Sequence, residues 1–238
     1  MKVVILAGGY GTRISEYTDQ IPKPMIKIGD KPILWHIMNF FSYYGHNDFY
    51  IALGYKAQVV KEYFLNYHTL NSDFSIDLKD GSIIQFQKNN SPWKVTLIDT
   101  GLDTMTGGRV KRMQSFIGDE PFLLTYGDGL SNVNLNELVN FHKSHKKMIS
   151  LTAVRPTARF GELVLNENDV TDFQEKPQLH KGWINGGFFV VNPDLFHLIE
   201  DDHIMLEREP LEKAVSMGQL KAFKHEGFWQ CMDTKRDK

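Results

Sequence analysis

The stretch Lys2-Val-Val-Ile-Leu-Ala-Gly-Gly-Tyr-Gly-Thr-Arg13 decides how this chain can fold. Its apolar part, Val3 to Ala7, is short, rich in β-branched residues and closed by glycines, which predicts a buried strand. Gly8, Gly9 and Gly11 then let the backbone turn and approach a ligand with no Cβ in the way. The amide groups of such a turn, with the N-terminus of a following helix, attract anions. The stretch therefore predicts a cradle for nucleotide phosphates.

Two known glycine loops provide a test of this prediction. Gly9-Tyr-Gly11 begins the dinucleotide-binding pattern, but Ile14 stands where its last glycine belongs. The sequence also lacks the Walker-A pattern G-x-x-x-x-G-K-[ST]. What remains is the glycine turn, Arg13 and then Lys23, whose flanking prolines restrict the backbone on both sides. A plain β–α turn with solvated charges is the alternative, and it leaves the restricted lysine unexplained.

Composition limits the class of protein. A chain of 238 residues, 42% of them hydrophobic, can bury a sizeable core in one α/β domain or two small ones. Its 27 basic and 29 acidic residues nearly cancel, whereas a general nucleic-acid binder needs a basic excess. The single Cys231 fits a reducing cytoplasm. The apolar runs are too short for a signal peptide or a bilayer span. We expect a soluble cytoplasmic protein that binds neither nucleic acid nor membrane.

Apolar strand-like runs alternate with amphipathic helical runs, which favours a single α/β domain of doubly wound type with a mostly parallel central sheet. We expect strands at 3–7, 49–53, 95–98, 122–125, 149–154, 186–191 and 220–223, and a β-rich stretch over 74–98 that includes Phe86. We expect helices over 31–44, 59–67, 134–142 and 210–217, a Gly-Gly loop within 104–117 that turns into a helix near Gly108, and a hairpin over 161–174. Ligands of such sheets bind beyond the carboxyl ends of the strands. The chain stops abruptly at Lys238, so a further C-terminal helix is expected.

Several motifs together resemble those of the sugar-1-phosphate nucleotidylyltransferases. They are Leu6-Ala-Gly-Gly-Tyr-Gly-Thr-Arg13, Pro22-Lys-Pro-Met25, Tyr126-Gly-Asp-Gly129, Phe173-Gln-Glu-Lys-Pro177, Asn185-Gly-Gly187 and Phe228-Trp-Gln-Cys-Met-Asp-Thr234. The marks of the branch that uses CTP are Lys31-Pro-Ile-Leu-Trp-His-Ile-Met38, Asp99-Thr-Gly101 and Met105-Thr-Gly-Gly-Arg109. The resemblance implies a Rossmann-like fold with a small β-rich sugar-binding part, and a homo-oligomer. It divides the single domain into a mainly nucleotide-binding half, 1–130, and a mainly sugar-phosphate-binding half, 131–238.

The implied reaction joins CTP and α-D-glucose 1-phosphate into CDP-glucose and pyrophosphate, a product for deoxysugar or surface-polysaccharide synthesis. A sugar phosphate is already an anion at neutral pH, so the reaction asks for alignment and charge neutralisation rather than a strong base. Mg²⁺ typically takes one or two protein carboxylates. Asp128, which lies between two glycines after a predicted core strand, is the first candidate ligand. Asp233 resembles the family's second ligand.

The resemblance also assigns residues to the two substrates. The predicted catalytic set is Arg13 on the pyrophosphate, Lys23 between phosphates, Asp128 on the metal and Lys176 on the sugar phosphate. The predicted nucleotide-binding residues are Leu6, Ala7, Gly8, Gly9, Tyr10, Gly11, Thr12, Arg13, Lys23, Thr104, Arg109 and Asp128. The predicted sugar-phosphate-binding residues are Gly161, Glu175, Lys176, Asn185 and Gly186, with Arg159 assisting. From spacing alone, Glu175 and Lys176 would be a solvated pair in a loop.

Other signals have plainer interpretations. His142 and His145 lie three apart on a predicted helix without a third ligand, so we expect a pair on the helix surface. Trp229 either stacks under the sugar or packs in the core, and Cys231 is expected to be structural. The sequence leaves UTP, dTTP or another sugar phosphate open as substrates. A homologue that binds nucleotide sugars without turnover is the alternative of another class.

Overall fold

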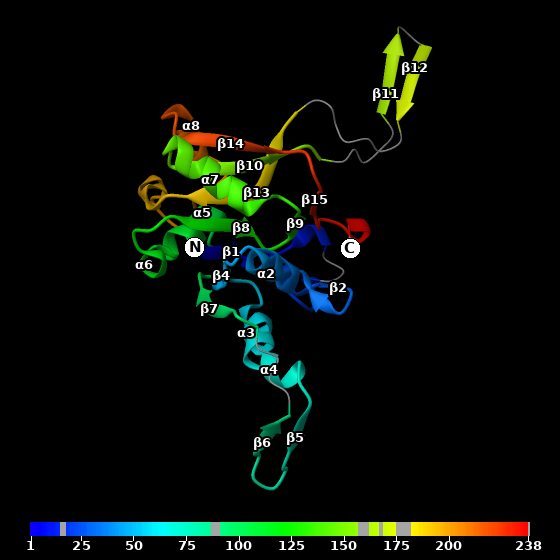
Figure 1. The fold of residues 1–238 in the computed structure, drawn as a ribbon, viewed down its shortest axis with the longest axis vertical. Helices are drawn as coiled ribbons and strands as arrows, with labels where there is room; N and C mark the ends of the chain where they lie inside the picture. The colour runs from blue at the N-terminus through cyan, green and yellow to red at the C-terminus, as the bar shows by residue number, and fades with distance from the viewer. Residues whose placement is uncertain (15–17, 87–90, 157–161, 167–168, 175–181, 238) are drawn as a thin grey trace.

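The computed structural model describes residues 1–14, 18–86, 91–156, 162–166, 169–174 and 182–237 (Figure 1). A seven-stranded sheet runs through the described residues in the order β14-β10-β13-β8-β1-β4-β7. In that order the strands are Leu220–His225, Ile149–Val154, Ile184–Val191, Phe122–Tyr126, Lys2–Leu6, Asp48–Leu53 and Lys94–Asp99. Strand β13 is antiparallel to both its neighbours, and the other adjacent strands are parallel. The mostly parallel sheet expected from the sequence is confirmed.

Strand β1 shows why helices cover both faces of the sheet. Its side chains alternate, so Val3 and Ile5 enter one buried cluster while Val4 and Leu6 enter the other. The first cluster includes α2 (Ile33–Tyr43), α3 (Ala57–Leu65) and α7 (Leu135–His145). The second includes α5 (Thr106–Arg112), α6 (Gln114–Ile117), η3 (Pro193–Leu198) and α8 (Glu209–Ser216). Each such apolar side chain contributes about 1.5–3 kcal/mol when fully buried. The doubly wound arrangement follows from burial on both faces.

One of the two-stranded sheets connects distant parts of the chain. Strand β15 (Trp229–Cys231) pairs antiparallel with β9 (Gly129–Ser131), which follows directly on the turn after β8. Strands β2 (Lys27–Ile28) and β3 (Lys31–Pro32) precede α2, so the helix expected from position 31 begins two residues later. The β15–β9 pair matters most for function, because it returns the end of the chain to the carboxyl end of β8.

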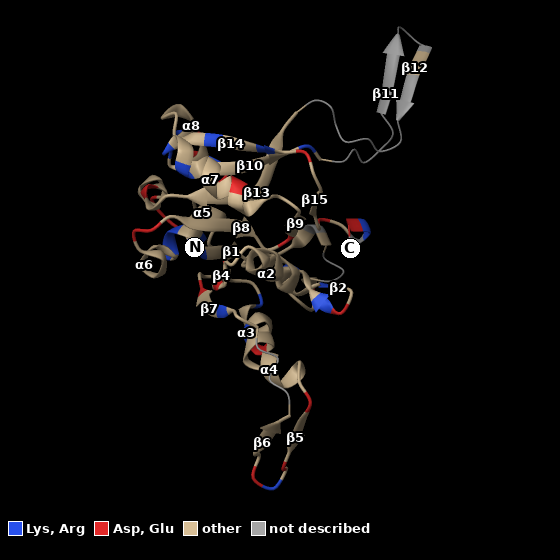
Figure 2. Ribbon diagram, in the orientation of Figure 1, with Lys and Arg blue, Asp and Glu red and all other residues tan. Residues whose placement is uncertain are grey.

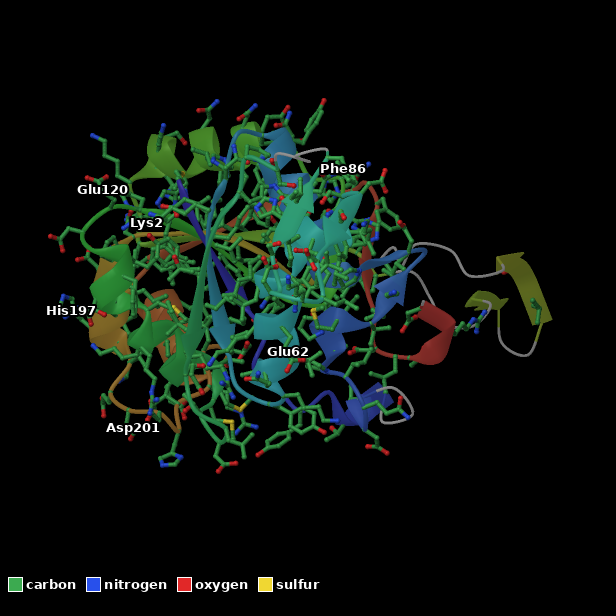
Figure 3. The ribbon with its side chains drawn as sticks, turned by 90° about the horizontal axis from the view of Figure 1, so that it is seen from below. Lys2, Glu62, Phe86, Glu120, His197 and Asp201 are labelled. Atoms are coloured by element: carbon green, nitrogen blue, oxygen red, sulfur yellow. The ribbon has the colours of Figure 1, made fainter. Side chains whose placement is uncertain are left out.

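Two hairpins extend away from the body of the molecule (Figure 1), and the one coloured yellow also does so when the molecule is seen from below (Figure 3). One is β11 (Glu162–Asn166) with β12 (Asp169–Gln174), as the sequence predicted. The other is β5 (Phe74–Ile76) with β6 (Ile83–Gln85), beyond the short helix α4 (Tyr67–Leu70). Phe86, expected within this β-rich stretch, lies one residue past β6. None of the helices in the described part of the chain has the length and apolar content needed to span a bilayer.

The helix within 104–117 differs from the prediction. It begins at Thr106, before the expected start near Gly108, so the Gly-Gly pair lies inside the helix. It is interrupted at Met113, where α5 ends and α6 starts. The start is fixed by tertiary contacts, because the amide of Met105 donates to the carbonyl of Asp202 and that of Gly107 to the carbonyl of Ile204. Helical periodicity carries no information about such contacts with a loop about a hundred residues away.

The surface position expected for His142 is wrong. Its side chain is buried, with Nδ1 2.9 Å from Ser150 Oγ and Nε2 3.1 Å from Asn192 Oδ1. Nε2 of His145 lies 2.7 Å from the same serine hydroxyl. Helix α7 packs on strand β10, which carries Ser150, so both rings reach a hydroxyl that the sheet provides. The pair is a structural hydrogen-bonding cluster.

The buried histidine makes stability depend on pH. Burial lowers the pKa of His142 from its ordinary value of 6.5, and the bond to Asn192 offsets part of this effect. The unfolded chain therefore takes up this proton first, so the stability that the neutral ring provides is full above about pH 6.5 and is lost as the pH falls below it. We expect a lower urea midpoint at about pH 5.5 than at about pH 7.5, and a smaller difference in His142→Gln. The exposed His203→Gln is the control, and an unchanged pH dependence in His142→Gln would contradict the assignment.

Candidate active site

A pocket of about 500 Å³ opens at the carboxyl ends of β1 and β8, the edge where doubly wound sheets bind ligands. The glycine loop forms one wall, the segment 102–106 another, and the turn after β8 a third. The predicted nucleotide-binding residues that line it are Leu6, Ala7, Gly8, Gly9, Tyr10, Gly11, Thr12, Lys23, Thr104, Arg109 and Asp128. The structure thus brings most of the predicted set to one pocket.

Other predicted site residues cannot be placed. The backbone of Arg13 lies in the short turn η1 (Thr12–Ile14), but its side chain is outside the described part of the chain. Residues Arg159, Gly161, Glu175 and Lys176 also lie outside the described residues. Their roles stay predictions from the resemblance.

The glycine loop is shaped by close packing. At Gly8 a Cβ would lie 2.5 Å from the guanidinium carbon of Arg109, and at Gly54 it would lie 2.7 Å from the carbonyl oxygen of Gly8. Gly11 has φ +66°, which favours glycine, and a Cβ there would lie 2.7 Å from Thr18 Cγ2. The loop therefore needs glycine for packing as well as for its turn.

Arg109 serves the pocket mainly as a brace. It is buried, and its Nη1 donates to the Leu53 carbonyl at 3.0 Å, to Thr100 Oγ1 at 2.7 Å and to the Gly101 carbonyl at 2.7 Å. Its Nη2 donates to the carbonyl of Leu102 at 3.1 Å. These bonds tie the end of β4 and the segment 99–102 together beneath the glycine loop. The nucleotide contact predicted for Arg109 stays a prediction, while its support of the pocket walls is a feature that the sequence did not reveal.

Lys23, Asp128 and Asp233 meet at the mouth of the glycine loop. The Lys23 ammonium lies 2.6 Å from Asp128 Oδ2 and 2.8 Å from Asp233 Oδ1. Lys23 begins the turn η2 (Lys23–Met25), with Pro22 extended before it and Pro24 inside the turn, so the two prolines do fix its backbone. The lysine and both carboxylates line the pocket. The structure thus brings Asp128 and Asp233 together, and their role as metal ligands stays a prediction.

The return of Asp233 depends on short-range bonds at the end of the chain. The β15–β9 pairing sets Cys231 opposite Gly129, and the amide of Met232 donates to the Asp128 carbonyl at 2.9 Å. Beyond it, Asp237 Oδ2 accepts from the amides of Asp233 and Thr234 at 3.0 and 2.7 Å. Asp237, which sequence reasoning missed, thus holds the backbone that presents Asp233.

The electrostatic balance of the cluster favours cations. Burial lowers the pKa of the Lys23 ammonium, but the carboxylates, Asp128 foremost, outweigh this and raise the pKa above 10.5. Lys23 is therefore charged at neutral pH. The oxygen atoms of the two carboxylates are ligands of the kind that a hard divalent cation takes.

Cys231 belongs to the same group, although it was expected to be merely structural. Its sulfur and one oxygen each of Asp128 and Asp233 all lie within 4.8 Å of one another, so the three could hold a metal ion. Burial, followed by the charge of Asp128, raises the pKa of the thiol to about 12. The thiol is thus protonated at neutral pH.

The described sugar-side candidates lie next to the pocket. Asn185 Nδ2 donates to the hydroxyl of Tyr126 at 3.4 Å, and Tyr126 lines the pocket. Gly186 permits close strand packing, because a Cβ there would lie 2.9 Å from the Thr152 carbonyl oxygen. The indole of Trp229 donates to the Gly186 carbonyl at 2.7 Å and packs against the core, which favours the packing interpretation.

Comparison with known proteins identifies the class. The model of the nucleotidyl transferase family matches residues 2–233. The glucose-1-phosphate cytidylyltransferase of Salmonella typhimurium is 50% identical, and the match covers all of this chain and 93% of that one. The probable glucose-1-phosphate cytidylyltransferase of Bacillus subtilis is 44% identical with the same coverage. The crystal structure of HddC from Yersinia pseudotuberculosis matches with a TM-score of 0.72 at 25% identity, over 99% of this chain and 95% of that one. The chain belongs to the nucleotidyl transferase family, and the predicted resemblance is confirmed.

The packing of the glycine loop gives a test with a matched control. In Gly8→Ala the new methyl group meets a guanidinium that four hydrogen bonds hold in place, so the strain is expected to cost about 1–3 kcal/mol. In Gly9→Ala a Cβ meets nothing within 4 Å. Without ligand, we expect Gly8→Ala to lower the Tm by about 2–4 °C for each kcal/mol of this strain. The Tm of Gly9→Ala should stay near that of wild type. Equal Tm values for the two variants would contradict the conclusion that the Arg109 side chain is held tightly against the glycine loop.

Proposed function

We propose that the chain transfers the cytidylyl group of CTP to α-D-glucose 1-phosphate, giving CDP-glucose and pyrophosphate. The observation that carries the reaction class is the meeting of Lys23, Asp128 and Asp233 beside the glycine loop. The choice of CTP and glucose rests on the 50% identity, over the full chain, to a glucose-1-phosphate cytidylyltransferase. A pocket of about 500 Å³ is large enough for a nucleotide.

The chemistry needs little beyond alignment and charge. A phosphate oxygen of the sugar phosphate attacks the α-phosphorus of CTP, forming a new P–O bond as the bond to the β-phosphate oxygen breaks. Pyrophosphate leaves with that electron pair. Because the nucleophile is already anionic, no side chain has to remove a proton from it, and the main barrier is the approach of two polyanions.

The donor set fits Mg²⁺, with Asp128 and Asp233 as its protein ligands. When bound, the ion would neutralise phosphate charge and favour in-line geometry. With both carboxylates committed to a cation, the Lys23 ammonium is available to the phosphates, where we propose that it stabilises charge in the transition state. Arg13 is proposed to hold the leaving pyrophosphate.

The remaining assignments divide between the two substrates. We propose that Thr104 and Arg109 contact the nucleotide, since both line the pocket, Thr104 in the segment 102–106 and Arg109 beneath the glycine loop. Lys176 and Glu175 are proposed to bind the sugar phosphate and sugar hydroxyls, with Gly161, Asn185 and Gly186 around the sugar. Assembly with copies of itself is also proposed. The hairpin β5–β6 supports it, because its two strands carry no charged residue (Figure 2) and its side chains Phe74, Ile76 and Ile84 are exposed.

One assay separates the proposed reaction from its alternatives. Pyrophosphate release is measured with glucose 1-phosphate, Mg²⁺ and each of CTP, UTP and dTTP in turn. We expect release with CTP, and at least tenfold lower kcat/KM with the other two, since base discrimination by a few hydrogen bonds is worth at least about 1.4 kcal/mol. Activity with UTP but not CTP would overturn the base assignment. No release with any triphosphate would favour a homologue that binds without turnover.

The metal role of Asp128 is tested by Asp128→Asn, which keeps the shape and removes the charge. We expect kcat to fall by at least about 100-fold, roughly 2.7 kcal/mol, with the Tm preserved within a few degrees. Direct Mn²⁺ binding, measured by calorimetry, should weaken in parallel. Asp194→Asn, at an exposed position outside the pocket, is the matched control. A loss of less than tenfold would show that the assignment is wrong.

A further inference from the structure

Glu207 lies between two residues of the pocket wall without lining the pocket itself. Its Oε1 accepts a hydrogen bond from the hydroxyl of Tyr126 at 2.6 Å. Its Oε2 accepts one from Thr106 Oγ1, also at 2.6 Å. Tyr126 ends strand β8, and Thr106 begins helix α5, so one carboxylate joins two elements that bound the pocket on different sides.

The direction of these bonds requires a carboxylate. The Tyr126 hydroxyl already accepts from Asn185 Nδ2 at 3.4 Å, and Thr106 Oγ1 already accepts from the amide of Leu206 at 2.9 Å. Each hydroxyl therefore directs its own proton toward Glu207. Two donors facing one side chain need an acceptor at both ends, and a carboxylate provides one at each. An amide would present an N–H to one hydroxyl, which would then have to accept and turn its own proton elsewhere, so the directions of both bonds would not be kept.

The two hydroxyls are also held by their surroundings. Burial, with the charge of Glu207 next, raises the pKa of the Tyr126 hydroxyl, so it keeps the proton that it donates. Gly187 has φ +83°, and a Cβ there would lie 2.7 Å from Tyr126 Cδ2, so the tyrosine ring packs on bare backbone. On the other side, a Cβ at Gly107 would lie 2.6 Å from the Ile204 carbonyl oxygen, so the loop that carries Glu207 presses against α5. The network is built into close contacts at both ends.

The elements that Glu207 joins carry the parts of the proposed reaction. Tyr126 is two residues before Asp128, a proposed metal ligand, and Asn185 is a proposed sugar contact. Thr106 is three residues before Arg109, which braces the glycine loop. A shift of about 1 Å between such groups can cost about 100-fold in rate.

We propose that Glu207 is a positioning residue for the nucleotidyl transfer. It fixes the pocket wall at the start of helix α5 relative to the carboxyl end of strand β8, which Asp128 follows. It acts through Tyr126 and Thr106, and it touches neither substrate. This inference rests on the proposed function. It adds to that function a physical connection between the nucleotide half and the sugar half of the site.

The first test is Glu207→Gln, with Glu212→Gln at an exposed position as the matched control. In the pyrophosphate-release assay, kcat is expected to fall at least tenfold while the KM for CTP changes less than threefold, at a temperature well below the Tm. The control is expected to match wild type. A kcat within threefold of wild type, or a fall in Tm with kcat unchanged, would overturn the positioning role. A wild-type enzyme that releases no pyrophosphate would instead contradict the proposed function.

The second test shows whether Glu207 acts through the two hydroxyls. Tyr126→Phe and Thr106→Val keep the shape and remove the hydroxyl, whereas Thr106→Ser keeps the hydroxyl. We expect the first two to lower kcat and Thr106→Ser to retain most of it. Combined with Glu207→Leu, which removes both acceptor oxygens, Tyr126→Phe should add much less than its single effect, because both changes break the same bond. Fully additive losses would overturn the proposed network.

Discussion

The site depends on the ammonium of Lys23 between the carboxylates of Asp128 and Asp233. This contact joins distant parts of the chain, because Asp128 follows Lys23 by 105 positions and Asp233 follows it by 210 positions. One positive charge facing two negative charges leaves the cluster with a net charge of about −1, at the place where a triphosphate has to approach. A divalent cation on the carboxylates would reverse that sign and leave the ammonium available to the phosphates. The charge balance of the cluster is therefore consistent with the proposed metal-assisted reaction.

The walls of the pocket depend on another buried cation. Arg109 is buried, and burial lowers the pKa of its guanidinium. The charge of Asp99 offsets part of this lowering. The guanidinium is tolerated because carbonyl oxygens and a threonine hydroxyl accept its protons. Those acceptors belong to segments that form the pocket, so satisfying the guanidinium also fixes their spacing. Gly8 and Gly54 must then be glycine, because any larger side chain would occupy the space of the guanidinium.

The sequence predicted the parts of this site that are encoded locally. Strand β1 and its glycines follow from a short apolar run, and Asp128 follows from a Gly-Asp-Gly turn after a core strand. The position of Asp233 came only from the resemblance, because β15 has three residues and no periodic signal. The burial of His142, the Arg109 brace and the place of Cys231 beside the carboxylates depend on which distant elements pack together. A local sequence pattern cannot show which distant elements pack together, whereas the glycine loop can be predicted from its own residues.

The division into a nucleotide half and a sugar half describes which substrate each part is proposed to bind. It does not describe two parts that fold separately. Strand β13 from the second half lies beside β8 from the first half in the same sheet, and β15 pairs with β9, which spans the boundary between the halves. Asp233 and Glu207, both late in the chain, contact Lys23, Thr106 and Tyr126 from the early part. Neither half could hold its proposed substrate residues in place alone. We therefore propose one cooperative unit, in which completing the sheet also assembles the cluster on which the transfer depends.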